Sequence, residues 1–236
     1  MNYGQFCPIA KATEILGEKW TFLIIRELVM GARRFNEMQR GLGDISPALL
    51  TARLKSLEDQ GIVARRKVQG QRTYEYWPTP ACMELAPVLV ALGKWGLQYA
   101  RHNVVDADLD VELLMLYLER SIDPKQLIGD QSVIQFKFRD LSRQQDWWLL
   151  VHDDNVDLCI TDPGKDVDVY FFSTLRVMHD VWMGDRTFKE AIRQGDLLVE
   201  GEPALVRDIS RWLKPSIFAD APRAPLPDGF GLALQG

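Results

Sequence analysis

The residues of this chain best suited to binding chemistry are basic side chains after residue 46, which lie between residues with small side chains. Small side chains let a backbone approach another surface, and Arg and Lys reach phosphates or guanine edges. The pattern therefore indicates nucleic-acid binding. The contacts it predicts to double-stranded DNA are Ser46, Pro47, Ala48, Thr51, Arg53, Lys55, Arg65, Arg66, Lys67 and Arg72.

Residues that serve catalysis or metal binding show no matching spacing. His102, His152 and His179 lie far apart, and the three cysteines form no C-x-x-C pair. The sequence also lacks a nucleophile elbow, a phosphate-binding loop and a dinucleotide fingerprint. Acidic residues between 153 and 168 lack the EF-hand pattern and are interpreted as solvated turns. The sequence thus predicts no enzyme, no metal site and no cofactor.

Cys7 is the cysteine whose position leaves two roles open. It directly precedes Pro8, which is suited to the first position of a helix. The dipole at a helix N-terminus lowers the pKa of a thiol there, which favours redox activity. The alternative is a packing role, and the sequence alone does not decide between the two.

Charge is distributed unevenly along the 236 residues. The whole chain has a formal net charge of −5. Residues 1–103 hold 14 Lys and Arg against 9 Asp and Glu, a net charge of +5, and the remainder has 14 against 24, a net charge of −10. Such asymmetry suggests two units with different partners. A hydrophobic content of 47% is ordinary for globular proteins and argues against disorder.

The elements that must position the basic residues begin with three expected helices. Apolar residues at helical spacing predict helices at residues 8–16, about 19–30 and 35–42. Gly17 and Gly31 are placed to end the first two of them. The buried face expected for the second helix consists of Trp20, Leu23, Ile24 and Leu28.

A fourth helix and a hairpin carry the basic residues themselves. Ser46 is a good N-cap, and Gly61 is placed to end the helix, whose buried stripe is Leu50, Leu54 and Leu57. Strand-forming residues then flank a turn at Gly70. Helix, turn, helix and basic hairpin together form a winged helix-turn-helix, with a helix in the major groove and the hairpin along a backbone or minor groove.

This region resembles the HxlR-type winged-helix transcriptional regulators over about residues 7–101. The resemblance is carried by Cys7-Pro8, Gly17–Trp20, Arg34–Glu37, Ile45–Pro47, Leu50-Thr51 and Leu54–Gly61. It implies a dimeric DNA-binding repressor or activator. The family usually has a Pro-Arg-containing wing tip, where this chain has Gly70-Gln71-Arg72, and a Leu-Thr-x-x-Gly start to the last helix, where it has Pro78–Cys82.

The expected helix from about Cys82 to Arg101 is apolar on two sides. A helix with two apolar stripes needs two partners, of which one is its own domain. The second is either another copy of the chain or the acidic half. A two-fold homodimer suits a palindromic operator. The predicted dimerisation residues are Leu85, Val88, Leu89, Leu92, Trp95 and Tyr99.

The acidic half shows the pattern of an α+β domain with one sheet covered by helices. A helix is expected at Val111–Ile122, followed by alternating strands around residues 134–138, 147–152, 156–160 and 167–171. Two helices, a strand at Leu197–Glu200 and a helix at Pro203–Leu213 complete it.

This half resembles the sterol-carrier-protein-2 type of lipid-binding domain through Asp168–Phe171 and Phe188–Gly201. Such folds leave an apolar tunnel between sheet and helices, so the resemblance implies an apolar small molecule as a partner. Bulky side chains suit such a site, although they also fill cores. The predicted ligand contacts are Phe136, Phe138, Trp148, Phe171, Met178, Trp182, Met183 and Phe188.

Two functions from different classes follow. The first is a cytoplasmic, homodimeric DNA-binding regulator with a DNA-binding and dimerisation domain at 1–103, a ligand-binding domain at 110–218 and a Pro/Gly-rich tail at 219–236. The second is an apolar-ligand carrier or enzyme accessory domain with a vestigial DNA module. The clustered basic residues favour the first. No signal peptide and no apolar run of the roughly 20 residues needed to span a bilayer occur, so no membrane partner is expected.

Overall fold

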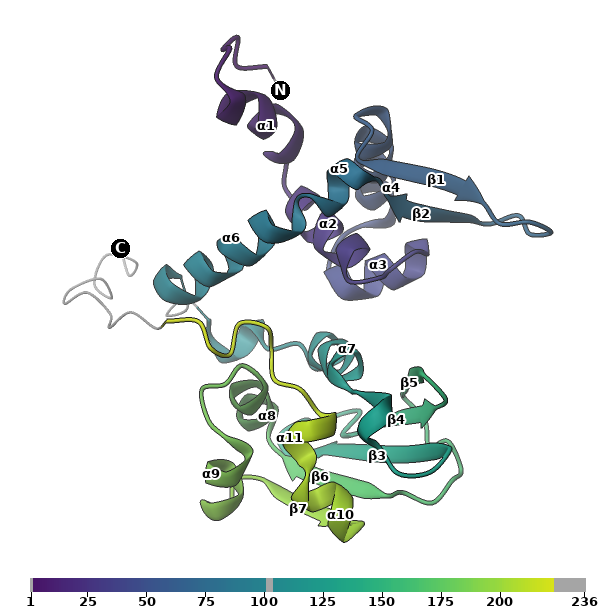
Figure 1. The fold of residues 1–236 in the computed structure, drawn as a ribbon, viewed down its shortest axis with the longest axis vertical. Coiled ribbons are helices and arrows are strands. Elements are labelled where there is room, and N and C mark those ends of the chain that lie inside the picture. The colour runs from purple at the N-terminus through teal and green to yellow at the C-terminus, as the bar shows by residue number, and fades with distance from the viewer. Residues whose placement is uncertain (1, 101–103, 223–236) are drawn as a thin grey trace. The chain divides into compact units, whose positions relative to one another are not determined.

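The structure, a computed structural model, describes residues 2–100 and 104–222 (Figure 1). The chain divides into two compact units, Met1–Gly93 and Lys94–Gly236, called here the N-terminal and C-terminal units. In the described residues no helix is long and apolar enough to cross a membrane. Beyond Pro222 the predicted tail lies outside the described residues, as does the predicted end of the 82–101 helix at Arg101.

The N-terminal unit consists of helices followed by a two-stranded antiparallel hairpin, as the sequence predicts. Its core contains Ile24, Leu28, Met38 and the stripe Leu50, Leu54 and Leu57 of the fourth helix. The elements are α1 (Pro8–Leu16), α2 (Thr21–Val29), α3 (Phe35–Leu42), α4 (Pro47–Asp59), β1 (Val63–Lys67), β2 (Tyr74–Pro78), α5 (Pro80–Met83) and α6 (Ala86–Tyr99), which continues past Gly93.

Two details of this unit differ from the expectation. Leu23 is 40% exposed, because the buried face of α2 runs through Thr21, Ile24 and Leu28 instead. The single helix expected from Cys82 is two helices, α5 and α6. Pro87 explains the break, since a proline ring inside a helix clashes with the carbonyl four residues earlier, here that of Met83.

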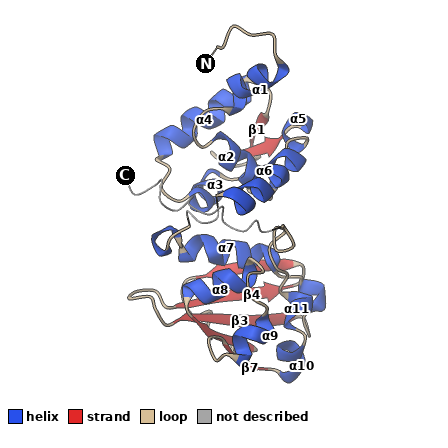
Figure 2. Ribbon diagram, turned by 90° about the vertical axis from the view of Figure 1, so that its left-hand side faces the viewer, coloured by secondary structure: helices blue, strands red, loops and turns tan. Residues whose placement is uncertain are grey.

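The C-terminal unit is α+β, with one five-stranded mixed sheet in the order β5-β4-β3-β6-β7 (Figure 2). In this sheet β3 and β6 pair in parallel, and the other three neighbouring pairs are antiparallel. The helix expected at Pro203–Leu213 is instead two short helices interrupted at Asp208. The elements are α7 (Val111–Ser121), β3 (Gln131–Phe138), β4 (Asp146–His152), β5 (Asn155–Cys159), β6 (Val169–Ser173), α8 (Leu175–Trp182), α9 (Phe188–Arg193), β7 (Leu198–Gly201), α10 (Pro203–Arg207) and α11 (Ile209–Trp212), with 3-10 turns η2 (Asp106–Asp108) and η3 (Pro124–Gln126).

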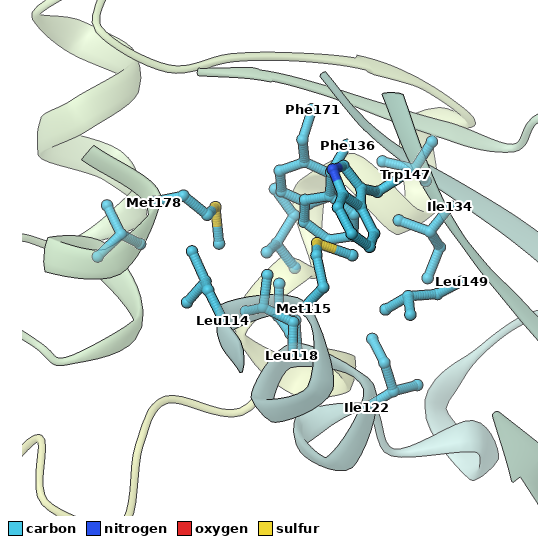
Figure 3. Packing of buried hydrophobic residues seen from close by; sticks show 14 of the residues in the cluster. Leu114, Met115, Leu118, Ile122, Ile134, Phe136, Trp147, Leu149, Phe171 and Met178 are labelled. Carbon is cyan, nitrogen blue, oxygen red and sulfur yellow. The ribbon is translucent and has the colours of Figure 1, made fainter. Parts of the chain in front are cut away.

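One face of this sheet forms the core of the C-terminal unit. Side chains alternate across a strand, so Ile134 and Phe136 of β3 lie on the same face as their register partners Leu149 and Trp147 of β4. The other half of the core comes from α7, α8 and α11. Figure 3 shows Met115 and Leu118 of α7 pointing toward these sheet residues. Alternation with period two thus predicted the buried face of β3 correctly.

Candidate nucleic-acid interface

Helix α4 presents a small, polar face on the side away from the core. Its start is fixed by Ser46, whose hydroxyl accepts a hydrogen bond from the backbone N–H of Leu49 at 3.3 Å, and by Pro47. Ala48, Thr51 and Lys55 are exposed. A helix with one buried stripe and small residues opposite can enter a major groove until its backbone nears the bases.

Arg53 differs from its exposed neighbours because the protein itself holds it. Its guanidinium forms an ion pair with the carboxylate of Glu18, and its Nε donates to the backbone carbonyl of Lys19 at 3.2 Å. Both partners lie in the connection between α1 and α2. Arg53 therefore fixes α4 against this connection, whereas Lys55 remains the exposed cation on the outer face of the helix.

A buried carboxylate ties α2 to α3, the helix that precedes α4. Glu27 is fully buried, and Arg26 Nε donates to its Oε1 at 2.9 Å. Arg26 Nη2 also donates to the carbonyl of Gly41 at 2.7 Å. No sequence motif pointed to Glu27. Its residue type could have indicated a buried ion pair, since a glutamate in an otherwise apolar helix is rarely fully buried unless it is paired.

The hairpin divides its basic residues between two faces. Residues directly opposite in an antiparallel pair share a face, and the register pairs Arg65 with Tyr76 and Lys67 with Tyr74. Arg66 pairs with Glu75 and so lies on the other face. The Arg65 guanidinium carbon lies 3.7 Å from the centroid of the Tyr74 ring, a cation–π contact that fixes its position.

The opposite face of the hairpin is built around Trp77. The guanidinium carbons of Arg33 and Arg66 lie 4.9 and 5.1 Å from the centroid of this ring. The indole N–H donates to a carboxylate oxygen of Glu75 at 3.2 Å. Arg33 also joins the hairpin to the helices, since its carbonyl accepts from the N–H of Tyr76 at 2.8 Å. None of these aromatic partners was predicted, because ring contacts depend on strand register.

Glu37 caps the start of α3. Its carboxylate accepts hydrogen bonds from the backbone N–H groups of Arg33 and Arg34, at 2.8 and 3.0 Å. Partial burial acts to raise the pKa of Glu37, but these two hydrogen bonds outweigh it and hold the pKa below its ordinary value. The carboxylate is therefore charged at neutral pH and already satisfied by the backbone.

Comparison with known proteins identifies the N-terminal half. A family described as HxlR-like helix-turn-helix matches residues 15–104. The HTH-type transcriptional regulator YvaP of Bacillus subtilis is 34% identical over 108 residues, which are 45% of this chain and all of that protein. The regulator sll1512 of Synechocystis is 34% identical over 107 residues, or 45% of this chain and 79% of that protein.

The chain belongs to the HxlR-like helix-turn-helix family. It is a DNA-binding transcriptional regulator of a non-enzymatic family. Among solved structures, the redox regulator HypR in its oxidised form is 30% identical and covers 42% of this chain and 99% of its own, with a TM-score of 0.36. The family match ends at residue 104, so it does not describe the C-terminal unit beyond that residue.

The α6 residues of this HxlR-like regulator separate into two sets. Leu85, which precedes α6, and Leu89 pack against the N-terminal core. The other four predicted dimerisation residues, Val88, Leu92, Trp95 and Tyr99, are between 46 and 57% exposed. The Trp95 and Tyr99 ring centroids are 5.6 Å apart. One exposed apolar stripe thus runs along α6.

The three cysteines differ in burial and have no disulfide partner among the described residues. Cys7 is half-buried and occupies the N-cap position of α1, as the sequence suggested. Cys82 is fully buried, and burial raises the pKa of its thiol to about 11. Burial, with the nearby Asp157, also raises the pKa of the Cys159 thiol. The thiols of Cys82 and Cys159 are therefore protonated and poor nucleophiles at neutral pH.

Most of the predicted ligand contacts lie together in the core of the C-terminal unit. Phe136, Phe138, Phe171 and Met178 are at most 1% exposed. The Phe136 and Phe171 rings stack with centroids 4.7 Å apart. Phe188, half-buried, packs against the same cluster, with its ring centroid 6.4 Å from that of Phe171. These rings fill the space between sheet and helices by contacting each other.

The remaining predicted ligand contacts lie at the edge of this cluster or outside it. Trp148 points to the opposite face of the sheet, because β4 alternates and Trp147 takes the inward position beside Phe136. Trp182 packs at the edge of the core, stacks on Tyr117 at 5.0 Å and donates from Nε1 to the Ser121 hydroxyl at 2.9 Å. Met183, at the C-cap of α8, is half-buried. Among the described residues no group of three or more His, Cys, Asp or Glu could hold a metal ion.

Proposed function

We propose that this HxlR-like regulator docks on double-stranded DNA through the outer face of α4 and the hairpin, as a homodimer, and that an apolar small molecule in the C-terminal unit modulates this binding. The observation that carries the docking is the exposed face of α4, with Ser46, Ala48, Thr51 and Lys55 free of the core. Residues 1–103 supply a net charge of +5, which favours contact with phosphates.

The proposed contacts follow the order of the elements. Ser46, Pro47, Ala48 and Thr51 approach base edges or phosphates at the start of α4, where helices of this kind read the major groove. Lys55 reaches a phosphate from the same helix. Arg53 acts as a positioning residue, because Glu18 and Lys19 already occupy its guanidinium. From the hairpin, Arg65, Lys67 and Arg72 contact the backbone. Arg66 lies on the other face of the hairpin, over Trp77, and makes no such contact in this proposal.

Replacing Lys55 with alanine is expected to weaken binding to every DNA duplex by a similar factor. A phosphate contact carries no sequence information, and each one releases counterions. The slope of log affinity against log salt should therefore become shallower by about one for each chain bound. Fluorescence anisotropy with a labelled duplex at several salt concentrations measures both quantities.

The matched control is Lys189→Ala, which removes an exposed lysine from α9 in the C-terminal unit and changes the net charge equally. Affinity and slope should stay at their original values in this variant. An unchanged salt slope in Lys55→Ala would show that α4 does not dock as proposed.

The homodimer is proposed from the exposed stripe of α6. Val88, Leu92, Trp95 and Tyr99 follow each other at spacings of four, three and four residues, as the core positions of paired helices do. Monomers seldom leave such a continuous apolar stripe in water. Pairing along it through a two-fold axis would present two α4 helices to the two halves of a palindromic site.

Trp95→Glu is expected to convert the dimer into a monomer. Two like charges would face each other across the axis in a place now lined by apolar side chains. Sedimentation velocity should show half the mass, and the salt slope on DNA should fall to about half, since one chain contributes half of the phosphate contacts. Ile160→Glu, at a 59% exposed apolar residue in the C-terminal unit, is the control and should remain dimeric. A dimeric Trp95→Glu protein would place the interface elsewhere.

The C-terminal unit is proposed to be of the sterol-carrier-protein-2 type and to bind an apolar molecule among Phe136, Phe171, Met178 and Phe188. Its five-stranded sheet, with helices supplying the other half of the core, and its aromatic interior support this proposal. A ligand entering this core must separate rings that contact each other, because packed interiors leave little free volume. Native mass spectrometry of the purified chain, searching for a co-purified apolar molecule, tests this part.

An alternative is an apolar-ligand carrier whose DNA module has lost its role. The clustered exposed cations of α4 and the hairpin favour the regulator over this alternative. A gel shift on the DNA flanking its coding sequence, with and without a lipid extract, separates the possibilities. DNA binding that no apolar extract alters would remove the sensor role and keep the regulator.

A further inference from the structure

A groove of about 340 Å³ lies between the start of α3 and strand β2 in the N-terminal unit. Both of its walls belong to that unit, and the groove is separate from the outer face of α4. One wall is formed by residues 34–36 at the start of α3, and the other by residues in and next to β2. The lining residues are Arg34, Phe35, Asn36, Thr73, Tyr74 and Tyr76.

Apart from the Phe35 ring, the side chains that line this groove are cationic or neutral hydrogen-bonding groups. Arg34 is exposed, and in the described part of the chain no carboxylate forms an ion pair with its guanidinium. Asn36 adds an amide and Tyr74 a phenol hydroxyl. The nearby carboxylate, Glu37, is turned to the backbone N–H groups of Arg33 and Arg34 and does not line the groove.

The strand register shows which hairpin cations border the groove. Tyr74 and Tyr76 are two residues apart and therefore share a face, and their direct partners across the hairpin are Lys67 and Arg65. Arg65 is held over Tyr74 by its cation–π contact. Arg66 projects from the other face, toward Trp77. Arg34 thus lines the groove, and Arg65 and Lys67 lie on the hairpin face that carries Tyr74 and Tyr76. Arg66 lies on the other face.

We infer that this groove seats a phosphate of the DNA backbone, with Arg34 as its principal charge and Asn36 and Tyr74 as neutral donors. The occupant follows from charge complementarity in a protein whose partner is DNA. Arg34 lines the groove, Arg65 lies over its Tyr74 wall, and Lys67 shares that face of the hairpin. The inference rests on the proposed docking through α4 and the hairpin. It implies that the hairpin face with Arg65 and Lys67 is turned toward DNA, and that the face with Arg66 and Trp77 is turned away from it.

The test compares Arg34→Gln with the original chain on a labelled duplex of mixed sequence over a range of salt concentrations. Arg34→Gln is expected to weaken binding to every duplex and to make the salt slope shallower by about 0.9 per chain, the value for one lost phosphate contact. Arg34→Lys keeps the charge and should restore the slope. Asn36→Ala should lower affinity by about three- to tenfold without changing the slope, since it removes an uncharged hydrogen bond.

Arg66→Gln is the matched control, because it removes a neighbouring arginine from the opposite face of the same hairpin. Its salt slope should equal that of the original chain. A slope that falls as much in Arg66→Gln as in Arg34→Gln would overturn the assignment of faces. Thermal unfolding of each variant checks that the N-terminal unit keeps its stability, which is expected because both arginines are exposed.

The outcomes also separate this inference from the docking of α4. If Lys55→Ala lowers the slope and Arg34→Gln does not, the groove inference is wrong and the α4 docking stands. If Arg34→Gln lowers the slope and Lys55→Ala does not, the groove holds a phosphate and α4 docks differently. Unchanged slopes in both variants would overturn the two together.

Discussion

Gly41→Ala is expected to destabilise the N-terminal unit by about 2–4 kcal/mol, although alanine is the better helix former. A Cβ atom at Gly41 would overlap the carboxylate of Glu27. That carboxylate is fully buried and paired with Arg26, so moving it would disturb this pairing and the packed core around it. The added methyl group would therefore strain an ion pair whose carboxylate is buried and also overpack the core.

DNA affinity should fall together with the stability in this variant. Gly41 lies near the end of α3, and its carbonyl is held by Arg26, so a shift there changes the angle at which α4 leaves α3. Chemical unfolding gives the stability, and hydrogen exchange should show faster exchange in α2 and α3. Gly96→Ala is the control, because the space around that helical glycine is open. Equal behaviour of the two variants would show that Glu27 yields without cost.

Gly201→Ala is expected to cost the C-terminal unit about 3 kcal/mol or more. Gly201 has a φ of 137°, and a Cβ atom there would overlap the backbone carbonyl oxygen of Asp168. Asp168 is fixed, since its N–H donates to the Val133 carbonyl at 2.9 Å and its carboxylate accepts from the Val133 N–H at 2.7 Å. Neither strand can move without breaking the pairing of β6 with β3 or β7.

Hydrogen exchange on the full chain should show this loss confined to β6, β7 and the core between the sheet and its helices. Gly195→Ala is the matched control, because Gly195 also has a positive φ, of 77°, but nothing lies near its built Cβ atom. It should cost only about 1 kcal/mol, the strain of a left-handed residue. If Gly201→Ala cost no more than this, the close approach to Asp168 would not be important for stability.

The parts of the fold that were predictable depend on neighbours along the chain. The stripe Leu50, Leu54 and Leu57 and the cap at Ser46 follow from spacings of three and four residues and one side-chain oxygen. From Ile134 to Phe138 strand β3 alternates, so the buried face of this part could be assigned from the sequence alone. The break between α5 and α6 was missed, although Pro87 was visible as its cause.

The site was predicted less completely, because exposure and pairing depend on distant residues. Arg53 and Lys55 look equivalent in the sequence, but Glu18, 35 positions before Arg53, binds only the first of them. Three successive basic residues in the hairpin also look alike, and only the register with β2 divides them. Trp147 and Trp148 differ in the same way, since one position of alternation sends them to opposite faces.

By itself, the sequence determined the helices and hairpin of a DNA-binding module, its positive charge and an α+β partner domain, because caps, periodicity and charge counts are local properties. Only the tertiary structure decided which cations are held by other side chains, which share a hairpin face with the tyrosines of the groove beside α3, and which aromatic rings fill the core. The physical reason is that ion pairs, cation–π contacts and ring packing require atoms within a few ångströms of each other, a distance that spacing along the chain does not specify.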